Sequence, residues 1–257
     1  MIKIFINPSK FSHFADIIFK PLLIFSILTL SIGLLFALYL SPEDYQQGST
    51  VRIMYIHVPS AWLSMLTFFI MTIYSIVALA FKIPFGFIVN SAVAPIGATF
   101  TFICLLTGSL WGKPMWGTWW VWDARLTSVA ILFIIYLIII FFRRSFSNLD
   151  VGEKITAIFI IVSSINLPII KFSVDWWNTL HQPASFIKMS GPAIHTSMLV
   201  PLLLMALAFK GYYVWLLLIR MRGEINFMKV RALRLRQMYT DVDLTQSHSK
   251  TVNNRVS

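Results

Sequence analysis

Six apolar runs, each long enough to cross a lipid bilayer, constrain this chain more than any other feature of its sequence. A membrane-spanning helix needs about 17 to 25 predominantly apolar residues. Charged residues make up only 12% of the chain, against about 25% in a typical soluble domain. The sequence therefore predicts an all-α polytopic membrane protein with six transmembrane helices, at residues 21–40, 53–81, 87–110, 126–142, 155–172 and 193–219.

The basic residues predict how these spans are oriented. Six spans place both termini on one side, and 16 of the 21 Lys and Arg residues fall on that side. Because basic loops stay in the cytoplasm, both termini are expected to be cytoplasmic, or on the matrix side in an organelle. The chain then divides into a cytoplasmic leader (1–20), a six-helix domain (21–219) and a basic cytoplasmic tail (220–257) that frays beyond Tyr239. The net charge of +11 is thus a signal of topology, and no nucleic acid partner is expected.

A tryptophan-rich segment between the third and fourth spans is the most unusual stretch. Five of the nine tryptophans lie within twelve residues, and glycines and a proline interrupt them. One interpretation is an aromatic belt at the headgroup level. The other is a loop at the outer face whose indole rings form a binding platform for a planar ligand. Five tryptophans in one loop favour the platform, whose members are Trp111, Trp116, Trp119, Trp120 and Trp122.

Two histidines are expected at the same membrane face as this segment. His57 lies in the first turn of the second span, just before Pro59, and His181 lies in the loop after the fifth. A single histidine at a helix end is commonly an interfacial residue, but two beside an aromatic platform favour metal ligation. A planar iron porphyrin takes two axial imidazoles, whereas a zinc site needs three or four ligands. His57 and His181 are therefore candidate ligands of a haem iron.

Asp123 and Arg125 close the tryptophan segment, and each has two interpretations. Asp123 can cap the helix that follows, and Arg125 can anchor that helix at the interface. Alternatively both orient the ligand, since arginine binds carboxylates in a bidentate manner and haem carries two propionates. Nothing in the sequence predicts an enzyme: it has no phosphate-binding loop and no Ser-His-Asp order. Its one cysteine, Cys104, excludes CxxC chemistry.

The segment WGKPMWGTWWVWDARLTS, residues 111–128, resembles the WWD domain of haem-handling membrane proteins. That family includes the cytochrome c maturation proteins C and F, and the six-span length is similar to the haem exporter C branch. Further segments carry the same resemblance over about residues 42–236: PEDYQQG, RIMYIHVPSAW, APIGATFTFICLLTGS and NLPIIKFSVDWWNTLHQP.

The resemblance implies a haem-binding protein of the inner membrane that takes haem b at its outer, periplasmic or intermembrane-space face. It implies His57 and His181 as axial ligands and the tryptophan segment, residues 111–127, as the porphyrin contact. It also implies delivery of haem to the haem chaperone CcmE, in a complex with the ABC transporter subunits CcmA and CcmB and the small protein CcmD.

Two alternatives stay open at this point, a quinone- or solute-binding transporter subunit and a purely structural subunit. The expected compartment is the inner membrane of a Gram-negative bacterium, or the mitochondrial inner membrane for an organelle-encoded chain.

Overall fold

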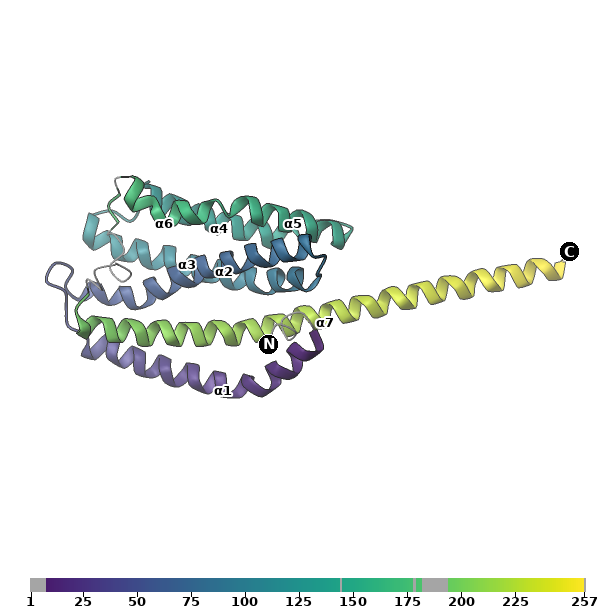
Figure 1. Cartoon of the computed structure of the whole chain (residues 1–257), viewed down its shortest axis with the longest axis horizontal. Coiled ribbons are helices and arrows are strands. Elements are labelled where there is room, and N and C mark those ends of the chain that lie inside the picture. Colours follow the sequence, from purple (N-terminus) through teal and green to yellow (C-terminus); the bar gives the residue numbers. More distant parts are fainter. Residues whose placement is uncertain (1–7, 144, 178, 182–193, 257) are drawn as a thin grey trace.

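The computed structural model describes residues 8–143, 145–177, 179–181 and 194–256, and most of them are helical. Figure 1 shows the helices packed side by side as one bundle, with the last helix extending far beyond it. η2 is a π-helical turn that continues α1, and η3 is a 3₁₀ turn that leads into α2. In chain order the helices are α1 (Pro8–Leu35), η2 (Phe36–Leu40), η3 (Ser49–Ile53), α2 (Met54–Ala80), α3 (Phe85–Trp116), α4 (Ala124–Phe142), α5 (Leu149–Ser163), α6 (Asn166–Trp176) and α7 (Thr196–Val256).

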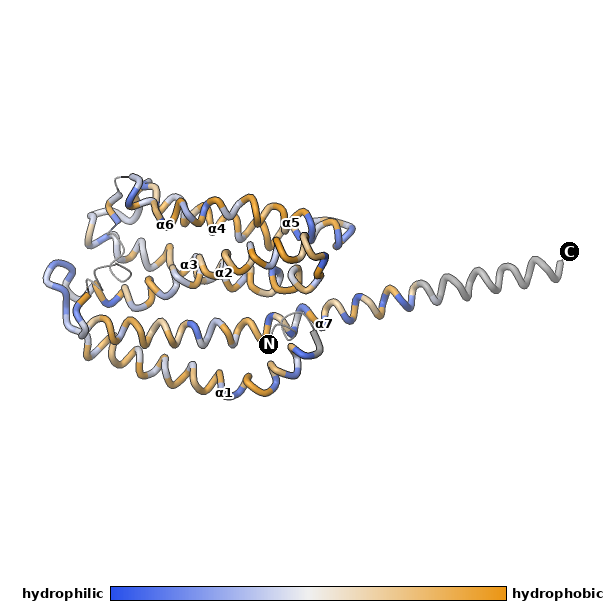
Figure 2. Tube along the Cα trace, in the orientation of Figure 1, coloured by the Kyte–Doolittle hydropathy of each residue, from blue (hydrophilic) through white to orange (hydrophobic). Residues whose placement is uncertain are grey.

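The predicted six-span, all-α fold is confirmed. Within the described residues, six segments are long and apolar enough to cross a membrane: Lys10–Leu40, Ser49–Phe81, Phe85–Trp116, Ala124–Phe142, Leu149–Trp176 and Thr196–Met238. Figure 2 shows apolar residues along the bundle and hydrophilic residues gathered at its ends.

Both ends of the chain depart from the boundaries that the sequence predicts. The leader is helical from Pro8 onward, as the first part of α1, and the tail continues as α7 to Val256 instead of fraying beyond Tyr239. The tail has no glycine or proline after Gly223 and is rich in leucine, arginine and methionine, which are strong helix formers. The start of the sixth span predicted at Ala193 lies outside the described residues.

α3 is the central helix of the bundle. Of its most apolar stretch 67% is buried, against 17% for α1. Gly97 of α3 leaves room for the ring of Tyr136 from α4, which would overlap a Cβ at this position. The Tyr136 hydroxyl donates to the main-chain oxygen of Ser64 in α2 at 2.7 Å. One buried tyrosine thus joins α2, α3 and α4 and fixes their relative positions.

α1 lies on the outside of the bundle and packs along α7 (Figure 1). Small residues bring the two helices close: Gly33 of α1 faces Met205, and Gly211 of α7 faces Ser26. Contacts of this kind drive helix association in membranes, where dispersion contacts replace the hydrophobic effect.

The fifth span, predicted as one helix over 155–172, is divided into α5 and α6. Pro168 has no N–H for the carbonyl of Ser164 one turn earlier, so the helical ladder is interrupted there. The side-chain amide of Asn166 donates to the main-chain oxygen of Ser128 in α4 at 2.9 Å. α5 packs mainly on α2, whereas α6 packs on α4. The break therefore turns the end of the span toward α4, where Arg125 lies.

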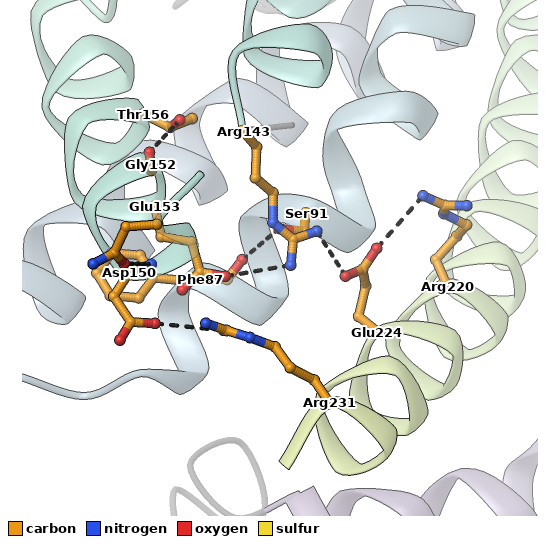
Figure 3. A network of polar contacts seen from close by, with 11 residues as sticks. Phe87, Ser91, Arg143, Asp150, Gly152, Glu153, Thr156, Arg220, Glu224 and Arg231 are labelled. Carbon is orange, nitrogen blue, oxygen red and sulfur yellow. Dashed lines mark hydrogen bonds and ion pairs between the residues drawn. The ribbon is translucent and has the colours of Figure 1, made fainter. Parts of the chain in front are cut away.

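The two ends of the bundle differ in chemistry. The last turns of α3 and α6 and the start of α7 lie at one end (Figure 1). At the other end, Figure 3 shows Arg143 of α4 between two carboxylates, Glu153 of α5 and Glu224 of α7, at 3.3 and 2.8 Å. Further ion pairs join Arg231 to Asp150 at 3.5 Å and Arg222 to Asp16. These contacts tie α7 to α1, α4 and α5 at the end far from the histidines.

Candidate functional site

His57 and His181, far apart in the sequence, lie next to each other at one end of the bundle. Their ring centroids are 6.5 Å apart, and the ring planes make an angle of 34°. His57 stands in the first turn of α2, and His181 follows the end of α6. The fold therefore brings together the two histidines that the sequence singles out, between the ends of α2, α3, α4 and α6.

His57 is oriented by the C-terminal end of α3. Its Nδ1 lies 3.1 Å from the main-chain oxygen of Cys104 and 3.1 Å from Oγ1 of Thr107. The Thr107 hydroxyl donates to the main-chain oxygen of Ile103 at 2.6 Å, so its oxygen can accept from His57. Both neighbours of Nδ1 are thus acceptors, which places the ring proton on Nδ1. Nε2 then carries the lone pair that binds a metal, the arrangement found in most metal-bound histidines.

His181 has the opposite kind of neighbour. Nη1 of Arg125, in the first turn of α4, lies 3.3 Å from Nδ1 of His181. The same guanidinium donates from Nε to Oγ of Ser173 at 3.1 Å and from Nη2 to the main-chain oxygen of Lys171 at 3.3 Å. Arg125 is therefore fixed on α6 by two contacts while its third nitrogen holds the histidine.

The tryptophan segment is only partly a loop. Trp111 and Trp116 belong to the last turns of α3, and the connection to α4 holds the other three tryptophans. α3 continues this far because Gly112 leaves room for the ring of Trp116. It ends at Gly117, whose φ of 74° suits a glycine C-cap. The interpretation of residues 111–127 as a single loop is wrong at both ends, because residues 111–116 belong to α3 and residues 124–127 to α4.

The five indoles lie in different environments. The ring of Trp111 meets that of His57 edge to face, at 5.7 Å between centroids, and its Nε1 donates to Oε1 of Gln47 at 2.8 Å. Trp119 and Trp122 are exposed, by 54% and 80%. Trp120 packs edge to face on Trp122 at 5.5 Å. The segment thus offers one indole that supports the histidine pair and a set of accessible apolar rings beside it.

Asp123 fills the cap position that the sequence predicts for it. Its Oδ1 accepts from the main-chain N–H of Leu126 at 2.7 Å. Its Oδ2 and the indole Nε1 of Trp120 are buried without a hydrogen-bond partner among the described residues. Buried polar atoms without a partner are costly in proteins. These two atoms are a donor and an acceptor left for a ligand.

Four residues around the pair go beyond what the sequence predicts: Gln47, Thr107, Gly108 and Ser173. A Cβ at Gly108 would lie 3.0 Å from Cε1 of His57. Ser173 is fully buried and accepts from Arg125. In the sequence each is only a small or polar residue near the end of an apolar run. This is a weak signal, because each residue acts through a contact with another helix.

A family model described as heme exporter protein C matches residues 1–236. The heme exporter protein C of Bradyrhizobium diazoefficiens is 50% identical over 231 residues, which cover 90% of this chain and 88% of that one. The chain belongs to the heme exporter protein C family. The protein of the same name from Haemophilus influenzae is 49% identical over 207 residues, covering 80% and 84% of the two chains. A putative cytochrome c biosynthesis ccmC-like mitochondrial protein from Marchantia polymorpha is 50% identical over 173 residues, covering 67% and 73%.

The heme exporter protein C match extends over both ends of the bundle. It includes the histidine pair, the tryptophan segment and the ion pairs of Arg143, so the described site lies wholly inside the family region.

Proposed function

We propose that this chain binds haem b between His57 and His181 and delivers it to the haem chaperone CcmE during cytochrome c maturation. The observation that carries the proposal is the pair of adjacent imidazoles, 6.5 Å apart at their centroids. Membership of the heme exporter protein C family supports a role in heme export and cytochrome c maturation. In this role the chain holds and transfers a substrate and is not an enzyme.

The separation of the two rings fits one metal ion between them. With a metal–nitrogen bond of about 2 Å on each side and roughly 1 Å from nitrogen to ring centre, the two centroids would stand about 6 Å apart. The distance of 6.5 Å agrees with this value. Haem supplies an iron that takes two axial nitrogens, and a planar ring that carries two carboxylates.

The surrounding residues suit such a ligand. Nε2 of His57 is the ring nitrogen left for the iron by the contacts of Nδ1. Trp111 supports that imidazole, and the exposed rings of Trp119 and Trp122 offer flat apolar faces for the porphyrin. We expect Trp116 and Trp120 to contact the porphyrin as well. The buried indole N–H of Trp120 is left for an acceptor on the ligand. Arg125 offers a charged donor for a carboxylate of haem, and Oδ2 of Asp123 offers a buried acceptor.

We assign the histidine end to the outer face of an inner membrane, bacterial or mitochondrial. The opposite end holds Arg143 and Arg220 together with the basic start of the tail, and basic segments stay on the cytoplasmic or matrix side. Both termini then face that side. We expect the ATP-binding partner CcmA on that side, because haem handover by this chain involves no nucleotide site of its own. We expect CcmB and CcmD beside the bundle in the lipid bilayer.

The absorbance spectrum of the purified protein tests the proposal. The parent is expected to bind haem with a Soret band and with the sharp α and β bands of a reduced six-coordinate iron. His57→Gly and His181→Gly should each change the spin state, and the double variant should lose stable binding, which added imidazole partly restores. His195→Gly is the matched control, since His195 is exposed and contacts Ser197. Parental spectra in both single variants would rule out axial ligation.

A further inference from the structure

We propose that Arg125 is a latch on His181: it holds the ring in a form that cannot bind iron, and haem ligation must release it. This inference rests on the proposed function, because it concerns how the second histidine becomes a ligand. It makes the two histidines unequal, with His57 ready for the metal and His181 held back.

The chemistry of the contact determines the state of the ring. A guanidinium has only donors, so Nδ1 of His181, 3.3 Å from Nη1 of Arg125, must be the acceptor. A neutral imidazole has one N–H, which then stands on Nε2. One nitrogen of His181 thus has its lone pair directed at Arg125, and the other carries the proton. Neither presents a lone pair to a metal.

Ligation by either nitrogen therefore breaks the contact with Arg125. If the iron takes Nε2, the ring proton moves through solvent from Nε2 to Nδ1, and Nδ1–H then faces an N–H of Arg125. Two donors cannot form a hydrogen bond, so the ring of His181 must move away from Nη1 of Arg125. If the iron takes Nδ1, it displaces Arg125 directly. The ring stays neutral in both cases, and no net proton is taken up.

His57 shows the contrasting arrangement. Its Nδ1 lies against the oxygens of Cys104 and Thr107, which accept its proton. Its Nε2 lone pair is available before any ligand arrives. We therefore expect haem to attach first through His57 and to recruit His181 second.

The released arginine stays at the site. Nε of Arg125 remains bound to Ser173, a fully buried side chain, and Nη2 remains close to the main-chain oxygen of Lys171. Only the Nη1 contact needs to open, and this nitrogen then becomes a free charged donor beside the ligand. Carboxylates are the groups that such a donor binds best. Opening the latch thus exchanges a histidine nitrogen for a carboxylate of the haem.

Binding of two iron porphyrins distinguishes the two roles of Arg125, which are to hold His181 and to bind a carboxylate of the haem. Haem carries carboxylates, and iron octaethylporphyrin carries none. In detergent, Arg125→Met should bind octaethylporphyrin about tenfold more tightly than the parent, since no charged hydrogen bond has to be broken. It should bind haem no more tightly, because the carboxylate partner is lost as well. Lys171→Met is the matched control: it removes a cation at the same depth, while its main-chain oxygen, which Arg125 uses, remains. It should leave the affinity for octaethylporphyrin at the parental value.

A second measurement needs no haem. The ¹⁵N chemical shifts of His181 in the haem-free protein, assigned with a His181→Gln variant, should report a proton on Nε2. In Arg125→Met the share of the ring protonated on Nε2 should fall. The latch is overturned if the parent shows the proton on Nδ1, or if Arg125→Met weakens both porphyrins alike. A haem spectrum that is absent from the parent, with the expected shifts retained, would instead remove the proposed function and leave the Arg125–His181 contact established.

Discussion

Gly108 lies directly beneath the imidazole of His57: a Cβ on Gly108 would stand 3.0 Å from Cε1 and 3.5 Å from Nδ1 of that ring. The contact at 3.0 Å is tighter than most packed carbon atoms show, so the ring would have to shift by a few tenths of an ångström if this carbon were added. Since Nδ1 also contacts Thr107 from the same helix turn, a displaced ring loses its orienting partner.

We expect Gly108→Ala to lower haem affinity several-fold while the protein keeps its thermal stability. Alanine is the better helix former by roughly 1 kcal/mol, which offsets the strain of moving His57. Haem titration and thermal unfolding in detergent measure the two effects separately. Gly223→Ala in α7 is the control, because nothing lies within 4 Å of the added carbon. Parental haem affinity in Gly108→Ala would show that the ring does not need this space.

Gln47→Leu should loosen Trp111 and, through it, His57. The variant removes the acceptor of the Trp111 Nε1–H, which lies at 2.8 Å in a partly buried site. An indole donor left without a partner costs about 1 kcal/mol or more. We expect a lower melting temperature and weaker haem binding. Gln46→Leu is the control, because it makes the same change at the neighbouring residue, whose side chain is exposed. Equal effects of the two variants would contradict this role of Gln47.

Arg143→Met should destabilise the bundle far more than Arg222→Met. The carboxylates of Glu153 and Glu224 are only 6% and 15% exposed. Both pair with Arg143, and Glu224 has a second, longer contact with Arg220 at 3.9 Å. Leaving a buried charge without its partner costs about 3–5 kcal/mol. Arg222 pairs with Asp16, which is 69% exposed, and such surface pairs contribute about 0–1 kcal/mol. The melting temperatures of the two variants test this prediction. Similar values would mean that water reaches the ion pairs of Arg143 and that they are no stronger than a surface pair.

The parts of this molecule that the sequence predicts well are those set by local chemistry. An apolar run of sufficient length must become a membrane helix, because its backbone has no other way to satisfy its hydrogen bonds in lipid. Asp123 before such a run predicts the helix cap, and its Oδ1 does accept from Leu126. The placement of His57 and His181 at one end follows from counting spans, and the fold brings the two rings together.

The remaining features depend on contacts between helices. Pro168 interrupts the fifth span between α5 and α6, and the direction that α6 then takes depends on a contact with α4, from Asn166 to the main-chain oxygen of Ser128. Arg220 and Arg231 look like topological charges in the sequence, yet both pair with acidic residues, Glu224 and Asp150. The opposite hydrogen-bonding states of His57 and His181 depend on Thr107 and Arg125, which lie on helices other than their own. Residue types alone give no indication of such partners.

Trp119→Ala and Trp122→Ala should speed the release of haem without destabilising the fold. Both indoles are largely exposed, by 54% and 80%, so the folded chain gains little from burying them. An aromatic contact with a ligand contributes about 1 kcal/mol beyond area burial, so each variant should pass haem to apomyoglobin a few times faster than the parent. Trp215→Ala provides the contrast, because Trp215 packs against Phe19 and Tyr212 in α1 and α7. That variant should lower the melting temperature and release haem at the parental rate. If Trp119→Ala and Trp122→Ala also release haem at the parental rate, the exposed rings do not contact the porphyrin, and Trp111 with the two histidines must hold it alone.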